Sequence, residues 1–299
     1  MMEKMKVLLL VLFCWLLPSI GKAGNTTQSL QGKTVMFIGN SFVYYGDCVI
    51  NGKQKAADTG LFYTLCKQNG ETVNVIDCTY GGHHLKDFTA NGCVSSSLHT
   101  GGASGGCAGV GTDLLAGLDL SKVDVVVFSE SGDNNANFLT DAKAVMARFT
   151  NTNTHFVYLS HSYTYIKNHT KIINNLPALK ALGVDVVEWG KVVYDLINGN
   201  AAFKGISCNK NTFIKNKGDT YHPNPLAGYL TALMTYCCLT NKSAVGQPYA
   251  FCQSVVNCST YISKYYSAAS DTNFLDFLNS KNKMTQLQKL ADIYLFVNQ

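Results

Sequence analysis

Residues 35–42 read Val-Met-Phe-Ile-Gly-Asn-Ser-Phe, an apolar run that ends abruptly in a polar turn. Four consecutive apolar residues predict a strand that is buried on both faces, as in a parallel sheet. A Gly-Asn turn directly after such a strand raises Ser41 above the carboxyl edge of the sheet. Because ligands of open α/β sheets bind at that edge, Ser41 is a candidate functional residue.

Along the rest of the chain, short apolar runs alternate with segments whose apolar residues have helical spacing. We expect strands near 33–39, 72–78, 123–129, 155–160 and 184–188, and helices near 54–69, 138–150, 169–182 and 190–198. This alternation predicts a parallel sheet with helices on both faces. The expected fold is an α/β three-layer α/β/α sandwich with a flavodoxin-like parallel sheet and right-handed crossovers.

A second polar segment, residues 219–222, reads Asp-Thr-Tyr-His. A serine hydroxyl is a poor nucleophile until a base accepts its proton and a carboxylate orients that base. His222 and Asp219 are three positions apart, so a single turn brings both side chains to one side. The sequence therefore offers Ser41, His222 and Asp219 as a catalytic triad.

The residues after His222 predict a rigid support for it. Asn224 is a typical N-cap and Pro225 is a typical first helical residue. Apolar residues then recur at three-and-four spacing through position 237, which predicts a helix packed on the core.

The GNSF block at 39–42 and the DxxHP block at 219–223 resemble those of the SGNH/GDSL hydrolases, over most of residues 33–240. In that family the first-block serine is the nucleophile, and the late Asp and His complete the triad. The resemblance implies these roles for Ser41, Asp219 and His222, and it implies the same three-layer fold. GNSF in place of the commoner GDS form indicates a less studied branch, here secreted and cysteine-rich.

The family also uses a second-block Gly and a third-block Asn in its oxyanion hole. Residues 80–85, Tyr-Gly-Gly-His-His-Leu, fit the second block and imply Gly82. The third block, Ser-Glu-Ser-Gly-Asp-Asn-Asn at 129–135, departs from the usual pattern. Matching by letters selects Asn134, whereas matching by distance from the strand selects Asp133. We prefer Asn134, because developing negative charge needs neutral donors such as this amide and the N–H groups of Ser41 and Gly82.

The first 23 residues have the features of a cleaved signal peptide. Two lysines precede an apolar run at 7–17, and small residues follow up to Ala23. About eleven apolar residues are too few to span a bilayer, so we expect a secreted protein without a membrane anchor; an uncleaved anchor is the alternative. Residues 24–299 are expected to form one hydrolase domain, with its core at 33–240 and a C-terminal extension at 245–299 that ends in a helix.

Ten of the 11 cysteines lie beyond the leader, and an oxidising compartment favours up to five disulfides among them. They are Cys48, Cys66, Cys78, Cys93, Cys107, Cys208, Cys237, Cys238, Cys252 and Cys258. The insertion at 90–112, rich in Gly, Ser and Cys, is expected to be a disulfide-pinned loop near the active edge. Asn25, Asn168, Asn241 and Asn257 begin Asn-x-Ser/Thr sequons, which mark a glycoprotein in a eukaryotic secretory pathway.

Composition excludes several classes of function. The formal charge of +5 falls to +3 without the leader, and no basic run stands out, so nucleic acid is not an expected partner. His83, His84 and His99 lack paired ligand spacing, and we expect neither a metal nor another cofactor. His161 is expected to be a core histidine. The oligomeric state is left open.

These features together predict a secreted carboxylic-ester hydrolase with a small-molecule or glycan ester substrate. Secretion and sixteen tyrosines favour an O-acetylated extracellular glycan. A secreted lipase is one alternative. A catalytically impaired binding or structural protein is another, and it would follow if the Asp133 carboxylate occupied the oxyanion site.

Overall fold

The centre of the molecule is a six-stranded sheet with the order β2-β3-β1-β4-β5-β6. The structure is a computed structural model and describes residues 28–46, 48, 55–56, 60–94, 107, 109–201, 207–215, 221–252 and 273–297. The strands are β1 (Thr34–Gly39), β2 (Lys55–Ala56), β3 (Asn74–Thr79), β4 (Val125–Phe128), β5 (His155–Leu159) and β6 (Asp185–Val187). All pairings are parallel except that of β2 with β3. The five predicted strands are confirmed.

Strand β1 lies in the middle of the sheet and contributes to both cores. Val35 and Phe37 belong to one hydrophobic cluster, whereas Met36 and Ile38 belong to the other, and all four are 0% exposed. This alternation explains why the strand is apolar without interruption, since helices cover each face of the sheet.

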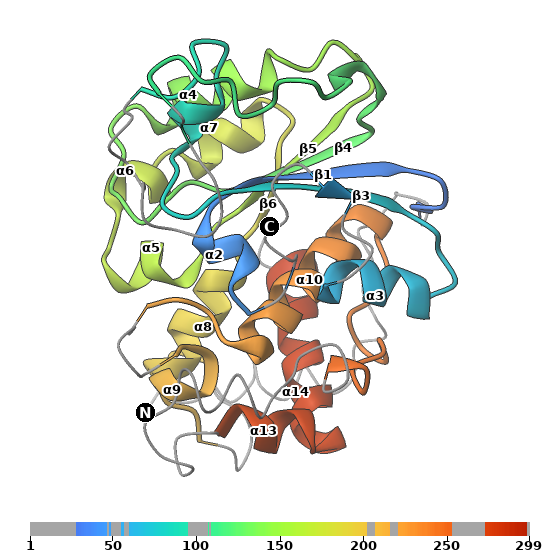
Figure 1. Cartoon of the computed structure of the whole chain (residues 1–299). Coiled ribbons are helices and arrows are strands. Elements are labelled where there is room, and N and C mark those ends of the chain that lie inside the picture. Colours follow the sequence, from blue (N-terminus) through green and yellow to red (C-terminus); the bar gives the residue numbers. More distant parts are fainter. Residues whose placement is uncertain are drawn as a thin grey trace.

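Helices form the outer two layers, as Figure 1 shows. One face of the sheet carries α4 (Phe138–Met146), α6 (Thr170–Ile173), α7 (Leu176–Ala181) and the 3-10 turn η1 (Leu85–Phe88). The other face carries α3 (Leu61–Gln68), α8 (Trp189–Ile197), α10 (Pro225–Thr240), α13 (Asn273–Leu278) and α14 (Lys281–Asp292). Shorter elements are α2 (Ser41–Tyr44), α5 (Ser162–Ile166), α9 (Lys210–Phe213), η2 (Leu120–Lys122) and the final turn η4 (Ile293–Val297). The predicted three-layer α/β fold is confirmed.

Two predicted helices differ from the structure. The region expected to be helical at 54–69 contains the short strand β2, and α3 begins only after Gly60, whose φ of 91° is not helical. The helix expected at 169–182 is split into α6 and α7. Pro177 stands at the start of α7, where a missing N–H costs nothing, but it cannot continue a helix from α6.

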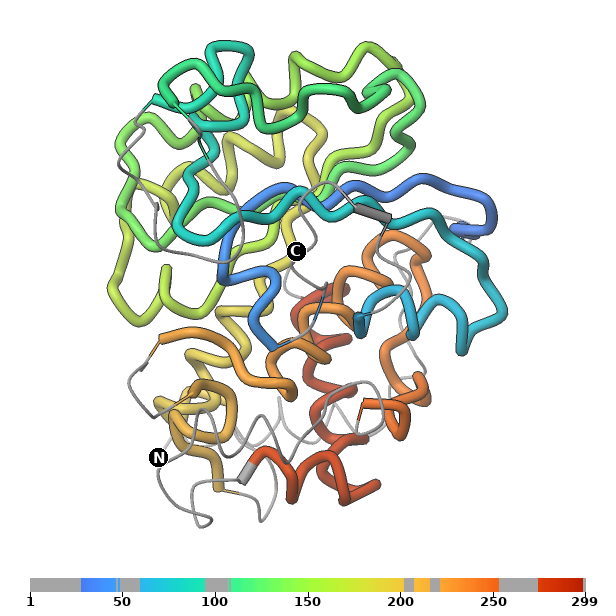
Figure 2. Tube along the Cα trace, viewed as in Figure 1, coloured from blue at the N-terminus to red at the C-terminus, as the bar shows by residue number. Residues whose placement is uncertain are grey.

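The C-terminal extension packs against α10. Phe274, Met284 and Leu287 are fully buried in the hydrophobic cluster that contains α10. Figure 2 shows this terminal segment in red on the same side of the sheet as the orange α10. The leader at 1–23 lies outside the residues that the structure describes. Among the described residues, no helix is both long enough and apolar enough to cross a membrane.

A backbone contact joins the segment that follows Ser41 to α10. A Cβ atom on Gly228 would lie 1.8 Å from the carbonyl oxygen of Gly46. Gly46 has a φ of +80°, and a Cβ atom there would lie 2.4 Å from the carbonyl oxygen of Asn224. Only glycine fits at either position, because the neighbouring atoms are backbone and cannot rotate away.

We predict that Gly228→Ala lowers the free energy of unfolding by about 2–4 kcal/mol, because the steric cost exceeds the gain in helix propensity of about 1 kcal/mol. Urea unfolding followed by circular dichroism measures the change. The matched control is Gly109→Ala, since nothing lies within 4 Å of a Cβ atom there; it should change stability by less than about 0.5 kcal/mol. Equal stability of the two variants would contradict the proposed close contact.

Candidate active site

Ser41 lies where β1 ends and is the first residue of α2. Asn40 caps this short helix, since its Oδ1 accepts a hydrogen bond from the Phe42 N–H at 3.0 Å. The Nδ2 of the same amide donates to the carbonyl oxygen of His83 at 3.2 Å. Asn40 is fully buried and Ser41 is 8% exposed. The asparagine of the GNSF block thus ties the serine turn to the loop after β3.

His222 meets this serine from a segment 181 residues away. Its Nε2 lies 2.7 Å from Oγ of Ser41, within the range of a strong hydrogen bond. The hydroxyl is the donor when Nε2 carries no proton. This is the arrangement that a general base needs to accept the proton of a serine nucleophile.

The backbone on both sides of His222 is held in place. Ile214 and Pro223 form an antiparallel bridge, and the Lys215 N–H donates to the His222 carbonyl at 3.1 Å. Asn224 then caps α10 through bonds from the N–H groups of Leu226 and Ala227 at 3.0 and 3.1 Å to its Oδ1. The predicted N-cap and helix start are confirmed.

The remaining predicted site residues are placed unevenly. Asp219 and His99 lie outside the described residues. Gly82 lies in the turn after β3, with a φ of +74°, next to the His83 carbonyl that Asn40 holds. The role of its N–H in an oxyanion hole stays a prediction.

The third-block loop is organised by Glu130, a residue that sequence reasoning missed. Its carboxylate is fully buried and accepts hydrogen bonds from the Ser131 N–H and from Nδ2 of Asn135, both at 2.7 Å. It also faces Nδ1 of His84 at 3.2 Å. Glu130 therefore links the loop after β4 to the loop after β3. The available clue was a carboxylate directly after a buried strand.

The two alternatives for the third block differ in position. The Asp133 side chain is 75% exposed, and its Oδ2 lies 3.4 Å from Nε2 of His84. The amide oxygen of Asn134 accepts a hydrogen bond from the Lys171 N–H at 2.9 Å. No hydrogen bond between Ser41 and either side chain is found among these described residues. The assignment of Asn134 as an oxyanion donor stays a prediction.

His161 is the core histidine that the sequence predicted. Its ring stacks on Phe42 with 4.0 Å between centroids and 6° between planes, and its Nε2 donates to the Glu130 carbonyl at 3.1 Å. Burial lowers the pKa of His161 to about 3, so the ring is neutral. The His161 ring therefore packs against Phe42, which in turn contacts His222.

Aromatic rings surround the imidazole of His222, which sequence patterns did not reveal. The ring centroids of Tyr221, Tyr45 and Phe42 lie 4.4, 4.5 and 5.0 Å from that of His222. Tyr163 lies a further 5.2 Å from Tyr221. The site therefore has an aromatic wall on the side of α2 and α5.

Cys93 and Cys107, which belong to the insertion at 90–112, form a disulfide, as expected. These cysteines and His83 gather within 4.8 Å, but sulfurs joined in a disulfide offer no thiolate to a metal.

The expectation that cysteine pairing is general is wrong for four positions: Cys66, Cys78, Cys208 and Cys237 have no disulfide in the structure. Cys66 and Cys78 belong to the clusters on opposite faces of the sheet, so they cannot reach each other. Burial raises the pKa of both thiols, which keeps them protonated and unreactive.

Two of the sequons lie in described parts of the chain. Asn168 is exposed and Asn241 is half-buried, and both have a positive φ, at 52° and 55°. Asn25 and Asn257 lie outside the described residues. Glycosylation stays a prediction.

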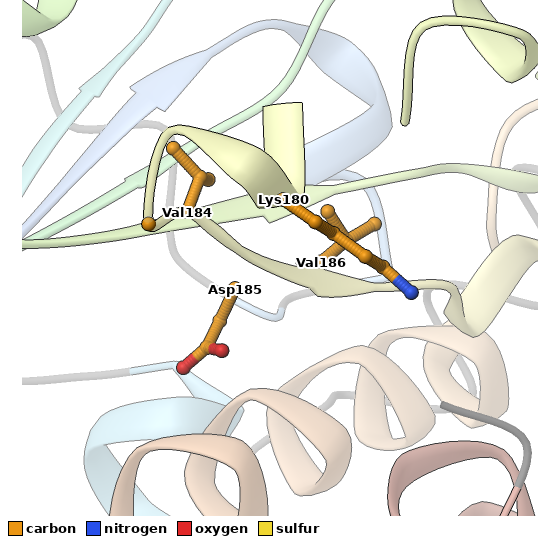
Figure 3. A pocket seen from close by; sticks show the side chains of 5 residues that line it. Lys180, Val184, Asp185 and Val186 are labelled. Atoms are coloured by element: carbon orange, nitrogen blue, oxygen red, sulfur yellow. The ribbon is translucent and has the colours of Figure 1, made fainter. Parts of the chain in front are cut away.

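A pocket near the start of β6 is separate from this site. Lys180, Gly183, Val184, Asp185 and Val186 line it, as Figure 3 shows. It lies toward the amino-terminal end of β6, whereas Ser41 follows the carboxyl end of β1 in the same parallel sheet. It is therefore not part of the candidate active site.

No protein-family model matches the chain, and no curated protein matches it. Among solved structures, the chain is similar to a DUF4886 family protein from Bacteroides uniformis, with 12% identity over 90% of this chain and 97% of that chain and a TM-score of 0.49. It is also similar to a "putative GDSL-like lipase" from Parabacteroides merdae, with 10% identity over 73% and 100% of the two chains and a TM-score of 0.44. A third similar structure is a family two carbohydrate esterase from Clostridium thermocellum in complex with cellohexaose. It has 16% identity over 72% of this chain and 65% of that chain, and a TM-score of 0.39.

The ion pair of His84 and Glu130 makes a pH-dependent contribution to stability. Burial alone would lower the pKa of His84, but the hydrogen bond and charge of Glu130, with the charge of Asp133, raise it above its ordinary value. A raised pKa in the folded state stabilises the protein fully below the unfolded value of about 6.5, and this contribution is lost as pH rises through the folded value.

We therefore predict that His84→Gln is less stable than the wild type at about pH 6, and that the difference shrinks as pH rises toward about 9. Urea unfolding at several pH values measures it. His155→Gln is the control, because its partner Asp185 lies at the amino end of β6, away from this loop. A stability difference for His84→Gln that is independent of pH would contradict the charged pair.

Proposed function

We propose that this protein is a carboxylic-ester hydrolase of the serine type. The observation that carries the proposal is the 2.7 Å contact between Nε2 of His222 and Oγ of Ser41. It stands at the carboxyl edge of a parallel sheet, where α/β proteins bind their ligands. The expected Asp219, three residues before His222 in the sequence, would complete the triad.

In the proposed mechanism, Oγ of Ser41 attacks the ester carbonyl while His222 accepts the hydroxyl proton. The imidazolium then gives this proton to the departing alcohol, which leaves an acyl-enzyme. A water molecule attacks the acyl-enzyme, with His222 again as base, and releases the acid. The N–H groups of Ser41 and Gly82, with Nδ2 of Asn134, are the proposed donors to the oxyanion.

The position of Asp133 favours catalysis over the impaired-protein alternative. That alternative requires a carboxylate at the oxyanion site. The Asp133 carboxylate is instead largely exposed and faces His84. The raised pKa of His84 favours its positively charged form, which attracts this carboxylate.

The aromatic wall supports an O-acetylated extracellular glycan as substrate. Tyr221 is 40% exposed and adjoins His222, and the Tyr163 ring extends this surface. Flat, partly exposed tyrosine rings can pack against the apolar face of a sugar and still hydrogen-bond through their hydroxyls. Extracellular substrates also agree with the proposed cleaved leader and secretion. A secreted lipase is the second candidate, since the same rings would accept an acyl chain.

We predict that the purified protein hydrolyses p-nitrophenyl acetate and that Ser41→Ala reduces kcat/KM at least about 1,000-fold, because the nucleophile is lost. Ser131→Ala is the matched control: its Oγ lies 3.4 Å from Nε2 of His84, so it is the serine of a second Ser–His contact. If Ser41→Ala kept its activity and Ser131→Ala lost it, the nucleophile would be Ser131 and the proposal would be wrong. Inertness of the wild type toward acetate, butyrate and octanoate esters would favour the impaired-protein alternative.

We further predict that Tyr221→Ala raises KM for an acetylated oligosaccharide about 2- to 10-fold and leaves kcat for p-nitrophenyl acetate unchanged, because the ring is proposed to contact the sugar and takes no part in the chemical step. Tyr221→Phe keeps the ring and should raise KM less than Tyr221→Ala does. An equal loss of kcat/KM on both substrates would show that Tyr221 positions His222 and does not bind the sugar. A preference for octanoate over acetate would point to lipids.

A further inference from the structure

A buried carboxylate closes the third-block loop on itself. Glu130 is 0% exposed, and it accepts the Ser131 N–H at Oε1 and Nδ2 of Asn135 at Oε2, both at 2.7 Å. These two donors lie on either side of Asn134 in the sequence. The Lys171 N–H, in α6, donates to Oδ1 of Asn134 at 2.9 Å. Both the shape of this loop and the orientation of the Asn134 amide are therefore held by hydrogen bonds.

The same carboxylate also holds the second-block loop. Nδ1 of His84 lies 3.2 Å from Oε1 of Glu130, and the Leu85 N–H donates to the same oxygen at 3.4 Å. Gly82 stands only two residues before His84. The two loops that carry the proposed oxyanion donors, Gly82 and Asn134, thus share one carboxylate.

Both loops also contact the serine turn. The Asn40 amide donates to the His83 carbonyl at 3.2 Å, which fixes the second-block loop. A Cβ atom on Gly132 would lie 3.2 Å from Cε2 of Phe42, so the third-block loop packs directly against the residue after Ser41. A shift of either loop would therefore move its donors relative to the nucleophile.

Each ring nitrogen of His84 faces a carboxylate. Nδ1 pairs with Glu130, and Nε2 lies 3.4 Å from Oδ2 of Asp133. Burial lowers the pKa of His84, but the hydrogen bond and charge of Glu130, with the charge of Asp133, outweigh burial and raise it above its ordinary value. When pH rises through this pKa, the imidazole loses the charge that balances Glu130 and the proton that faces Asp133. The neutral ring still donates from Nδ1 to Glu130.

Three further charged groups lie around His84. Asp87 accepts its backbone N–H at 3.0 Å. Lys86, on the same segment, opposes the positive charge of the imidazole, and Asp141 in α4 favours it. These groups stay in place in every variant considered below, so they act equally on the wild type and on the variants.

We propose that Glu130 and His84 are positioning residues for the proposed oxyanion donors, and that turnover falls at alkaline pH because their pair holds the two loops best while the imidazole is charged. This inference rests on the proposed esterase function and goes beyond it, since a Ser–His–Asp triad by itself gives activity that rises with pH and then stays level. Removing an oxyanion donor outright costs about 100- to 1,000-fold in kcat. Because the neutral imidazole keeps one hydrogen bond to Glu130, we expect a smaller loss, about 3- to 10-fold.

The first test is the pH profile of kcat on p-nitrophenyl acetate between about pH 6 and pH 9. The wild type should give a bell shape, with little change in KM on the alkaline side. His84→Gln donates one hydrogen bond and carries no charge, so its kcat should rise to a level plateau about 3- to 10-fold below the wild-type maximum. His155→Gln is the matched control, because it removes a His–carboxylate pair of 2.9 Å at the amino ends of β5 and β6, and it should keep the bell shape. A wild type without an alkaline fall, or a fall that persists in His84→Gln, would overturn the proposal.

A second variant leaves the buried pair intact. The Asp133 side chain is 75% exposed, so Asp133→Asn should fold like the wild type. Because the charge of Asp133 helps to raise the pKa of His84, its loss should move the alkaline fall toward lower pH. An alkaline fall at the same pH as in the wild type would show that another group causes it.

Amide hydrogen exchange tests the positioning role without turnover. We expect protection of residues 80–85 and 130–135, corrected for the intrinsic pH dependence of exchange, to fall together as pH rises in the full-length wild type. In His84→Gln the protection of both loops should be low at every pH. If only one loop responded, or if neither did, the proposal would be wrong. An inert wild type whose two loops respond together would support the positioning role and reject the esterase function alone.

Discussion

The geometry of the site depends on one close approach between two backbones. Gly46 follows the helix that begins with Ser41, and Gly228 lies one turn into the helix that follows His222. Their contact leaves no room for a side chain on either residue. Ser41 and His222 are 181 residues apart in sequence, so they can meet only where distant backbones pack together, as Gly46 and Gly228 do. The hydrogen bond between them is then a consequence of how the two backbones fit.

The other loops at this edge are joined by buried polar side chains. Asn40 connects the serine turn to the loop after β3, and Glu130 connects that loop to the one after β4. Each of these side chains is fully buried and makes several hydrogen bonds. Polar groups in such surroundings are costly unless their partners are in place, so they favour a single arrangement of the loops. Rigid loops of this kind suit a site that must hold donors in fixed positions.

The sequence predicted those parts of the fold that depend on local patterns. The five parallel strands, the Asn224 cap and the position of Ser41 all follow from periodicity and turn chemistry within a few residues. The antiparallel edge strand β2 and the break between α6 and α7 were missed, because two residues give no period and a single proline was outweighed by the helical spacing around it. The rings around His222, the Glu130–His84 pair and the buried Lys215 could not be predicted, since each depends on contacts between distant segments. Cysteine pairing was overestimated because composition does not reveal which face of the sheet a residue occupies.

Helix α10 has a consequence for how the chain is made. Every residue of this helix except Cys238 is buried, and α13 and α14 supply part of its cover. Those two helices follow α10 in the chain, so they are synthesised after it. Until they dock, α10 exposes apolar surface on the side that they later cover, next to the segment that carries His222. The early strands can form before these helices are made, whereas the packing around α10 is complete only once both have docked; apolar surface exposed in the meantime favours aggregation or binding by chaperones.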